Sequence, residues 1–493
     1  MTIRYFHPSI ALMALAALLF GAPAARAAVW YVAITGNDAN AGTLASPLRT
    51  IGKGIAKSTN GDTVLVADGT YNETNLDFGS TNLVLRSQSG NRAACILDCQ
   101  RLGPAIRIAG GQASAAVSSM TIKNAYATTN HIGAGLYIRS STVSVTNCIF
   151  SGNEFHVLGL GADAIYVDYG GNAAIADCGF SGNGGYTGTV LALAAGNTTV
   201  KNCTFSNNTT SAIGHFGGAC TATRCTFSGN FGNVGGAMDI QGGSMTATGC
   251  LFLSNQSVNF NSQIFLSPGS LTLNDSLFVG ATSTSMAAEV QGGAASFTNC
   301  TFVGASALLR VQVNGQIAMA NSIVWGASVA VSGVYALSGT TATVTYSDVS
   351  GGYSGTGNFT RDPVFVNAAA GNYRLQSTSP CINVASAAAP NLPAIDLDGA
   401  PRIIGAAPDM GAYEFLSSTP PLWFVDAGLG NDTTGTGSPS APYKTVTKVI
   451  SVAGPGQSVY IMRGNYGSDR PRITKSLRFY NWFDTGWARI GKP

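Results

Sequence analysis

A short phrase centred on Cys or Ser recurs along the middle of the chain. The Cys/Ser position falls at residues 148, 178, 203, 225, 250, 276, 300, 322 and 347, and Phe or Val stands two positions later. The steps between copies are 30, 25, 22, 25, 26, 24, 22 and 25 residues. A repeat of this length is typical of solenoids, in which each repeat packs mainly against its two neighbours.

Apolar residues flank this position with a period of two. Around Cys148, for example, Val143 and Val145 stand five and three residues before it, and Phe150 stands two after it. This alternation predicts short β-strands, and no apolar stretch of helical period lies between the repeats. Each repeat is therefore expected to form one coil of strands and corners, stacked at about 4.8 Å on the next coil. The predicted fold is all-β, a parallel β-helix.

A column of Asn follows the Cys/Ser position by five residues in five coils, at Asn153, Asn183, Asn208, Asn230 and Asn255. Asn tolerates left-handed backbone conformations and forms hydrogen bonds within its own turn. We expect these residues to form a sharp corner that is repeated from coil to coil.

The Cys column has a chemical and a packing interpretation. Metal or redox chemistry would need the same residue in each coil, whereas Ser276, Ser322 and Ser347 occupy the position in three of them. Parallel stacked side chains also aim their sulfurs poorly for a disulfide. We therefore expect small, buried and mostly free thiols. Cys95 and Cys99, outside the column, could pair in an oxidising compartment.

Residues 1–27 predict a secretory signal peptide. They contain Arg4, an apolar run over residues 10–20 and the small-residue cleavage site Ala25-Arg26-Ala27. Later segments lack the roughly 18 continuous apolar residues of a membrane-spanning helix. We expect a secreted or cell-surface protein without a transmembrane segment.

Charge argues against one class of partner. Only 10% of the residues are charged, against about 25% in an average domain. The net charge is +3, and Lys and Arg form no run, so a nucleic-acid partner is not expected. The expected partners are polysaccharides or cell-surface components, and the expected oligomeric state is a monomer.

Residues 28–71 predict an N-terminal cap made of a strand, a short helix and a strand. Ser46 and Pro47 suit the first positions of a helix, and Leu48, Ile51 and Ile55 then share one face. Such a helix would cover the open end of the first coil. Residues 72–365 predict the β-helix itself.

The rest of the chain breaks the period. Residues 366–416 predict a C-terminal cap, and residues 417–422, which contain Pro420-Pro421, predict a linker. Residues 423–493 repeat the opening segment, since Trp423-Phe424-Val425 echoes Trp30-Tyr31-Val32. This partial second copy is either an accessory unit or the start of a truncated second β-helix.

Two stretches resemble a known group of proteins. Residues 30–71 look like the opening segment of secreted bacterial right-handed β-helix proteins with the pectin/pectate lyase fold. Residues 362–415 look like the end of the choice-of-anchor Q domain, through the motifs Asp362-Pro363-Val364-Phe365, Ser379-Pro380-Cys381-Ile382-Asn383, Asp396-Leu397-Asp398-Gly399 and Asp409-Met410-Gly411-Ala412-Tyr413-Glu414-Phe415. The resemblance implies a single-stranded, right-handed β-helix, a fold whose enzymes act on acidic or neutral polysaccharides. Such proteins carry varied C-terminal anchors, and no sorting motif with a hydrophobic tail follows Phe415.

One strand of the coil is expected to place five residues on its outward side, Tyr137, Arg139, Tyr166, Asp168 and Asp239. We interpret them as a candidate glycan-contact face. Tyr137 and Tyr166 either stack on sugars or pack on each other, and Arg139 and Asp168 are expected to form a surface ion pair. Asp168 and Asp239 would lie three coils, or about 14 Å, apart, beyond the roughly 5–9.5 Å between paired glycosidase carboxylates.

No other constellation indicates catalysis, so no catalytic residue is predicted. His131, His156 and His215 are scattered, and His215 is expected to pack in the core or cap a turn. Asp163, in the turn before one of these strands, could bring a further carboxylate closer to the face.

Calcium has one candidate site. Asp38 and Asn40, with Asp432 in the second copy, offer the oxygen ligands that calcium prefers. An Asx turn explains the same residues without a metal. We therefore expect no cofactor.

Two functions stay open. The first is a secreted or cell-surface, non-catalytic β-helix protein that presents an extended surface for adhesion or glycan binding. The second is a polysaccharide lyase or glycoside hydrolase of the same fold. Scarce carboxylates and irregular outward positions favour the first function, because such catalysis needs paired carboxylates.

Overall fold

The computed structural model describes residues 27–490, apart from residues 130–131, 187, 261, 281–285, 305–308, 327–333, 338, 417–421, 439–440, 455–456, 462–464, 467–468, 470, 474–476 and 482–488. The predicted signal peptide lies outside the described residues except for Ala27, and His131 and most of the predicted linker fall in the gaps. Two short α-helices and one 3-10 helix are the only helices among the described residues, so the fold is all-β as predicted.

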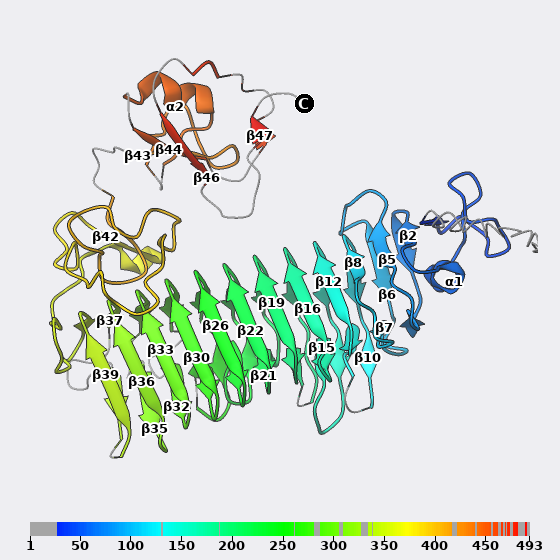
Figure 1. The fold of residues 1–493 in the computed structure, drawn as a ribbon, viewed down its shortest axis with the longest axis horizontal. Helices are drawn as coiled ribbons and strands as arrows, with labels where there is room; N and C mark the ends of the chain where they lie inside the picture. Colours follow the sequence, from blue (N-terminus) through cyan, green and yellow to red (C-terminus); the bar gives the residue numbers. More distant parts are fainter. Residues whose placement is uncertain are drawn as a thin grey trace, which may run out of the picture.

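Three parallel sheets run along the length of the main body, and each regular coil adds one strand to each of them in turn (Figure 1). Within the described residues, the sheets have 13, 12 and 11 strands. Sheet 1 contains β1 (Val29–Val32), β2 (Thr63–Val66), β5 (Val84–Ser87), β8 (Ala115–Ser118), β12 (Thr142–Thr146), β16 (Asn172–Ala176), β19 (Asn197–Lys201), β22 (Ala219–Thr223), β26 (Ser244–Thr248), β30 (Ser270–Asn274), β33 (Ala294–Thr298), β36 (Gln316–Ala320) and β39 (Thr341–Thr345).

Sheets 2 and 3 complete the coils. Sheet 2 contains β3 (Gly69–Tyr71), β6 (Cys95–Asp98), β9 (Thr121–Lys123), β13 (Ile149–Ser151), β17 (Gly179–Ser181), β20 (Thr204–Ser206), β23 (Thr226–Ser228), β27 (Leu251–Leu253), β31 (Leu277–Val279), β34 (Thr301–Val303), β37 (Ile323–Trp325) and β40 (Asp348–Val349). Sheet 3 contains β4 (Leu76–Asp77), β7 (Ile106–Ile108), β11 (Leu136–Arg139), β15 (Ala162–Asp168), β18 (Thr189–Leu193), β21 (Ser211–His215), β25 (Met238–Ile240), β29 (Ser262–Leu266), β32 (Met286–Gln291), β35 (Leu309–Gln312) and β38 (Val334–Ala336). Two further pairs of short strands extend the coils, β10 (Tyr126–Ala127) with β14 (Glu154–Phe155) and β24 (Phe231–Gly232) with β28 (Gln256–Ser257).

Successive coils stack in register, which confirms the predicted period-two assignment. Phe205 pairs with Phe227, and Phe227 with Phe252, in neighbouring strands of sheet 2. All three side chains are fully buried. Ring centroids along this Phe column lie 4.3–5.1 Å apart from Phe150 to Phe302. The interior of the solenoid is therefore a stack of like side chains, one per coil.

The corners correct one detail of the prediction. The Asn column does not supply the left-handed residue of its corner; the residue directly before each Asn does, as at Gly152 (φ 61°) and Asn207 (φ 52°). The Asn side chains instead link neighbouring coils. The Nδ2 of Asn183 donates to the Oδ1 of Asn208 at 3.1 Å and to the carbonyl of Phe150 at 3.0 Å. Burial makes these inter-coil bonds necessary, because an unpaired buried amide is costly.

All ten Cys residues are buried and free, so the packing interpretation of the column is confirmed. The disulfide considered between Cys95 and Cys99 is not formed. Thiols in the column donate weakly to backbone carbonyls, as Cys203 does to Lys201 at 3.2 Å. Burial raises the pKa of Cys220 to about 12, which leaves its sulfur protonated and unreactive.

The N-terminal cap contains the short helix α1 (Ile51–Lys57), which begins four residues later than the sequence predicted. Thr50 is its N-cap, and its side chain accepts a hydrogen bond from the Lys53 amide. The segment at Pro47 and Leu48 is held extended instead, because the Leu48 amide donates to the carbonyl of Tyr31 at 2.8 Å.

Asp38 fixes this turn. Its Oδ1 accepts from the amides of Arg49 and Thr50, both at 2.9 Å, and its Oδ2 accepts from the Thr50 hydroxyl. Asp432 makes the same three contacts with Lys444 and Thr445. Both oxygens of each carboxylate are thus occupied by protein donors, which favours a structural role over calcium, although the donors lie 11–13 residues away and the contact is therefore not the expected Asx turn.

The last part of the main body is a C-terminal cap. It contains the antiparallel pair β41 (Phe365–Asn367) and β42 (Asn372–Leu375) with the 3-10 helix η1 (Ala368–Ala370) between them. The residues after β42 are mostly turns, and they lie against one end of the solenoid (Figure 1).

The second copy of the opening segment has its own small core. It contains β43 (Leu422–Val425), α2 (Val446–Val452), β44 (Ser458–Ile461), β45 (Asn465–Tyr466), β46 (Arg478–Asn481) and β47 (Arg489–Ile490). Its order of strand, helix and strand is that of β1, α1 and β2. Val446, Val449 and Ile450 bury one face of α2 against β43 and β44. No helix among the described residues is long and apolar enough to span a membrane.

Candidate functional site

The predicted outward face is the outer side of sheet 3. The register pairs Tyr137 with Tyr166 and Arg139 with Asp168 in adjacent strands. Asp239 lies in the same column as Tyr166, three coils further on. The five residues therefore share the face predicted for them, but most of this face is not open to solvent.

Tyr137 and Tyr166 are packed on each other. Their rings are stacked with centroids 5.9 Å apart, and only 6% and 0% of the two residues is exposed. Ala162 and Ala192 complete this cluster, and Ile132 of the preceding turn packs on it. Burial raises the pKa of both phenols. The buried rings offer no free face to a sugar, so the structure favours the packing alternative.

The Arg139 side chain lies over the ring of Tyr169, with 4.1 Å between the guanidinium carbon and the ring centroid. Asp168 accepts instead from the Tyr137 hydroxyl at 3.3 Å and from the Tyr169 amide at 2.9 Å. The ion pair expected between Arg139 and Asp168 is not among the ion pairs of the described residues.

Asp239 points outward, as predicted, but is only 7% exposed. Gln241 donates to both of its oxygens, at 3.1 and 3.0 Å. Burial raises the pKa of this carboxyl to about 6. The neighbouring Phe265 stacks on Phe260 of the preceding turn at 5.0 Å, so turns that the strand pattern does not encode cover the column.

A second carboxylate, Glu289, lies in this column and was not among the residues predicted for the face. It lies two coils, or about 9.6 Å, from Asp239 and is fully buried. Gln291 donates to it at 3.1 Å, and Arg310 and Gln312 also contact it. Phe265 occupies the coil between the two carboxylates, so they do not face a shared open cleft. Among the described residues, no group of three or more His, Cys, Asp or Glu could hold a metal ion.

Two other residues considered from the sequence, His215 and Asp163, are buried in the protein interior. His215 is fully buried on the inward side of sheet 3, between Leu193 and Ile240. Asp163 is also buried and accepts from the Phe155 amide at 3.0 Å. Burial raises the pKa of Asp163 to about 7. Neither side chain reaches a surface.

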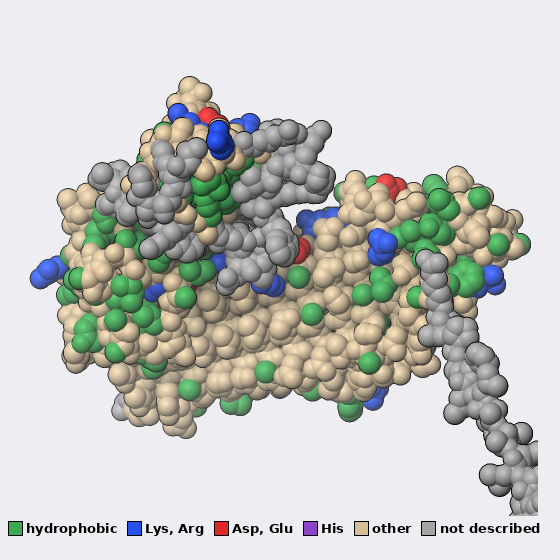
Figure 2. All heavy atoms as spheres, turned by 45° about the horizontal axis from the view of Figure 1, so that its top comes forward, with side chains coloured by type: hydrophobic (Ala, Val, Ile, Leu, Met, Phe, Trp, Pro, Cys, Tyr) green, Lys and Arg blue, Asp and Glu red, His purple; other side chains and the backbone are tan. Residues whose placement is uncertain are grey.

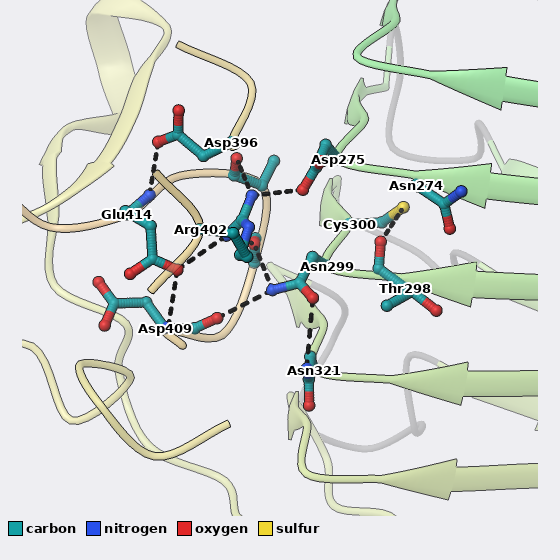
Figure 3. A network of polar contacts seen from close by, with 12 residues as sticks. Asn274, Asp275, Thr298, Asn299, Cys300, Asn321, Asp396, Arg402, Asp409 and Glu414 are labelled. Carbon is teal, nitrogen blue, oxygen red and sulfur yellow. Dashed lines mark hydrogen bonds and ion pairs between the residues drawn. The ribbon is translucent and has the colours of Figure 1, made fainter. Parts of the chain in front are cut away.

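A larger polar cluster joins the C-terminal cap to the coils (Figure 3). Arg402 is 1% exposed and contacts Asp275 at the corner before β31. It also donates to Glu414 at 3.1 Å. Burial raises the pKa of Glu414 to about 8, and the nearby carboxyls of Asp409 and Asp396 add to this rise while Arg402 opposes it.

The remaining carboxyls of this cluster hold the turns of the cap. Asp396 accepts from the Glu414 amide at 2.8 Å, and Asp409 accepts from the Asn383 amide at 2.7 Å. The acidic residues of segment 396–414 thus form a buried polar network that connects the cap to the solenoid. It leaves no surface for a ligand.

An exposed cluster lies in the turns between sheets 2 and 3. We call it the turn wall, and it consists of Arg101, Tyr126, Glu154, His156 and Tyr186. The pairing of β10 with β14 sets Tyr126 opposite Glu154. The Tyr186 amide donates to a carbonyl of β14 at 2.9 Å. The wall therefore runs across four successive coils.

The side chains of the turn wall form a row. The Arg101 guanidinium carbon lies 5.1 Å from the centroid of the Tyr126 ring. The His156 ring lies 4.9 Å from Tyr126 and 6.4 Å from Tyr186. Glu154 ties the row together, since Arg101 donates to it at 2.7 Å and the Nε2 of His156 lies 2.7 Å from its Oε2.

The wall is accessible, unlike the outer face of sheet 3. Tyr186 is 72% exposed, and Leu158, in the turn after β14, is 73% exposed. Aromatic side chains combine a large apolar face with a polar tip, and Arg and carboxylate groups offer planar hydrogen bonding. Sugars present apolar C–H faces and hydroxyls, so the wall has the groups that sugar recognition requires.

Sequence reasoning treated His156 as isolated and did not consider Tyr126 or Tyr186. The 30-residue step from Cys148 to Cys178, the longest in the series, could have marked the turn that holds His156. Tyr126 and Tyr186 lie outside this step, in the turns before Cys148 and after Cys178.

Comparison with known proteins agrees with this architecture. Residues 91–252 match the family described as right handed beta helix region. Residues 34–78 and 429–471 each match a family described as a protein of unknown function, DUF1565, which reproduces the internal repeat of the opening segment. The chain is thus a protein of the right-handed parallel β-helix class. A comparison with curated proteins finds no match.

Solved structures with similar folds include three polysaccharide lyases. Pectate lyase Pel9A aligns with 78% of this chain and 96% of its own, at 17% identity and a TM-score of 0.43. A PL6 family alginate lyase aligns with 88% of this chain and 66% of its own, at 12% identity and a TM-score of 0.39. A rhamnogalacturonan lyase aligns with 69% of this chain and 90% of its own, at 14% identity and a TM-score of 0.35. Likeness at these levels concerns the fold alone.

Proposed function

We propose that this protein is an exported, non-catalytic β-helix protein that binds glycans through the turn wall. The observation that carries the proposal is the row formed by the exposed Tyr186 and the partly exposed His156 and Tyr126 beside the Arg101–Glu154 pair. A sugar ring can stack on the open face of Tyr186 while its hydroxyls bond to the charged pair.

The geometry of the wall suits a chain of sugars more than a single ring. Its members come from successive coils about 4.8 Å apart, a spacing comparable to the length of one pyranose unit. Glu154 is held by both Arg101 and His156, so it needs little reordering when a ligand arrives. Preorganisation of this kind favours binding.

The test is affinity gel electrophoresis of the purified protein against a panel of soluble polysaccharides. Tyr186→Ala and Tyr126→Ala should each weaken the interaction with the retained polysaccharide by about 2- to 12-fold, if a sugar stacks with the roughly 0.5–1.5 kcal/mol of an aromatic pair. Tyr169→Ala is the matched control, because Tyr169 is 63% exposed but lies outside the wall. Equal retardation of all the variants would contradict the proposal.

One observation favours the second function, a glycoside hydrolase. Asp239 has a raised pKa of about 6, while Glu289 is held by Arg310. Carboxyls in such different environments suit an acid and a base. Release of reducing or unsaturated ends from the same panel, lost in Asp239→Asn, would support catalysis. We favour binding, because both carboxyls are buried.

Export and a choice-of-anchor Q-like role for residues 366–416 belong to the same proposal. The positively charged start and the Ala25-Arg26-Ala27 site support cleavage near Ala27. Mass spectrometry of the secreted protein should find a chain that begins close to Ala28. A secreted chain that still begins at Met1 would exclude this cleavage.

A further inference from the structure

The outward side of sheet 1 is broad, regular and nearly uncharged. Nine consecutive strands of this sheet, β12 to β39, are each five residues long. Each strand turns its first, third and fifth residues outward, which gives 27 positions. Of these, 16 hold Thr or Ser and only one, Lys201, is charged. The same side shows few charged residues below the C-terminal cap in Figure 2.

The positions form a two-dimensional lattice. All eight strand pairings from β12 to β39 lack register shifts, so each outward residue faces an outward residue of the next strand. Neighbours are about 4.8 Å apart across the strands and about 6.7 Å apart along them. A rigid parallel sheet thus repeats the same side chains in both directions.

Threonine fills the centre of this surface. The threonine lattice, as we call it, consists of Thr199, Thr221, Thr223, Thr246, Thr248 and Thr272, and its members are paired from β19 to β30. All six are at least partly exposed. Among the described residues, none of their hydroxyls hydrogen-bonds to a protein atom. The hydroxyls are therefore available to a ligand.

The C-terminal cap limits the lattice on one side. The Thr298 hydroxyl donates to the Pro390 carbonyl at 2.8 Å, and Asn274 is buried. The cap therefore covers the fifth position of β30, β33 and β36, whereas the first and third positions of these strands stay at least partly exposed. Toward the N-terminal cap, Ala174 continues the lattice beside Thr199, whereas Lys201 lies between Ala176 and Thr223.

We propose that the threonine lattice binds the surface of ice. Each Thr presents a methyl group, which orders the water beside it, and a hydroxyl, which bonds to that water. Repeated at fixed intervals of a few ångströms, these pairs hold water in rows of the scale found in the ice lattice. Charged groups would impose their own hydration, and the only one on the outward positions of β12 to β39 is Lys201, which pairs with Thr223 at the edge of the lattice.

Glycan is the competing ligand for a flat polar face. No aromatic residue occupies any of the 27 outward positions, and the face has neither the stacking rings nor the ion pair of the turn wall. Its methyl and hydroxyl groups suit contact with ordered water instead. The inference does not depend on the proposed glycan function, because it concerns a different side of the solenoid.

The test measures inhibition of ice recrystallisation and thermal hysteresis with the purified full chain. We expect the unchanged protein to slow recrystallisation. Thr221→Lys and Thr246→Lys should each need at least about a tenfold higher concentration for the same effect, since each places a long, strongly hydrated cation at the centre of the lattice. Their melting temperatures should stay unchanged, because these side chains point outward.

Thr204→Lys is the matched control. Thr204 is an exposed Thr of the same coils, but it lies on sheet 2. Thr246→Val, which keeps the methyl groups, should retain more activity than Thr246→Lys. Absence of any effect of the unchanged protein on ice, or equal loss in Thr204→Lys, would overturn the proposal. So would retention on an insoluble polysaccharide that only the lattice variants lose.

Discussion

Arg402 of the C-terminal cap contacts Asp275 at a corner of the solenoid, across 127 positions of the chain. Asp275 occupies the left-handed position directly before Ser276 (φ 47°). The residue that turns one coil thus also anchors the cap, and the same guanidinium reaches Glu414. The cap is therefore held by a buried charge network as well as by apolar packing.

Arg402→Met should detach the cap. Removing one partner of a buried ion pair costs about 3–5 kcal/mol, because the remaining charges are left uncompensated. Limited proteolysis should then cut residues 396–415 well before the coils. Arg374→Met is the control, since the Arg374–Asp398 pair is partly exposed and should matter less. If Arg402→Met and the unchanged protein resist proteolysis equally, Arg402 does not hold the cap on the solenoid.

Cap docking should weaken with rising pH. Burial raises the pKa of Glu414 from 4.5 to about 8, so the folded state holds this proton more tightly than the unfolded state. The resulting stability is complete below about pH 4.5 and is lost as the pH rises through about 8. Proteolysis of the cap should be faster at pH 8.5 than at pH 6 after correction for protease activity. Glu414→Gln should reduce this difference.

The number of free thiols can be measured directly. Denaturation without reductant should expose close to ten reactive thiols, because all ten Cys residues are free. The physical reason is the stacking of parallel side chains, which leaves neighbouring sulfurs poorly oriented for a bond. Four or five intact disulfides would rule out this packing.

The period-two pattern predicted the coil because one side of each strand must be buried. The Phe column and the outward positions of Tyr137 and Asp239 follow directly from that pattern. The burial of Tyr137 and Asp239 does not follow from the pattern, because it comes from turns. One such turn places Ile132 on the tyrosines. Turn packing has no periodic signal, and for the same reason the sequence did not indicate the turn wall. The Asn column was identified, but its bonds reach neighbouring coils, which only the stacking distance reveals.

Phe227→Ala should destabilise its own coil and the two beside it. The ring stacks between Phe205 and Phe252 at 5.1 and 5.0 Å, and its loss should cost about 3–5 kcal/mol through the transfer and cavity terms. Because a solenoid is coupled mainly between neighbours, hydrogen exchange should rise most over residues 202–255.

Asp239→Asn tests a residue on the outward side of the coil, in contrast to the inward Phe227. Burial raises the pKa of Asp239 from 3.8 to about 6, so at pH 7 the folded state carries a carboxylate that it disfavours. An uncharged Asn should therefore leave stability unchanged or slightly higher at pH 7, as measured by chemical denaturation. A neutral Phe227→Ala together with an unfolded Asp239→Asn would mean that the inward and outward sides of the coils are reversed.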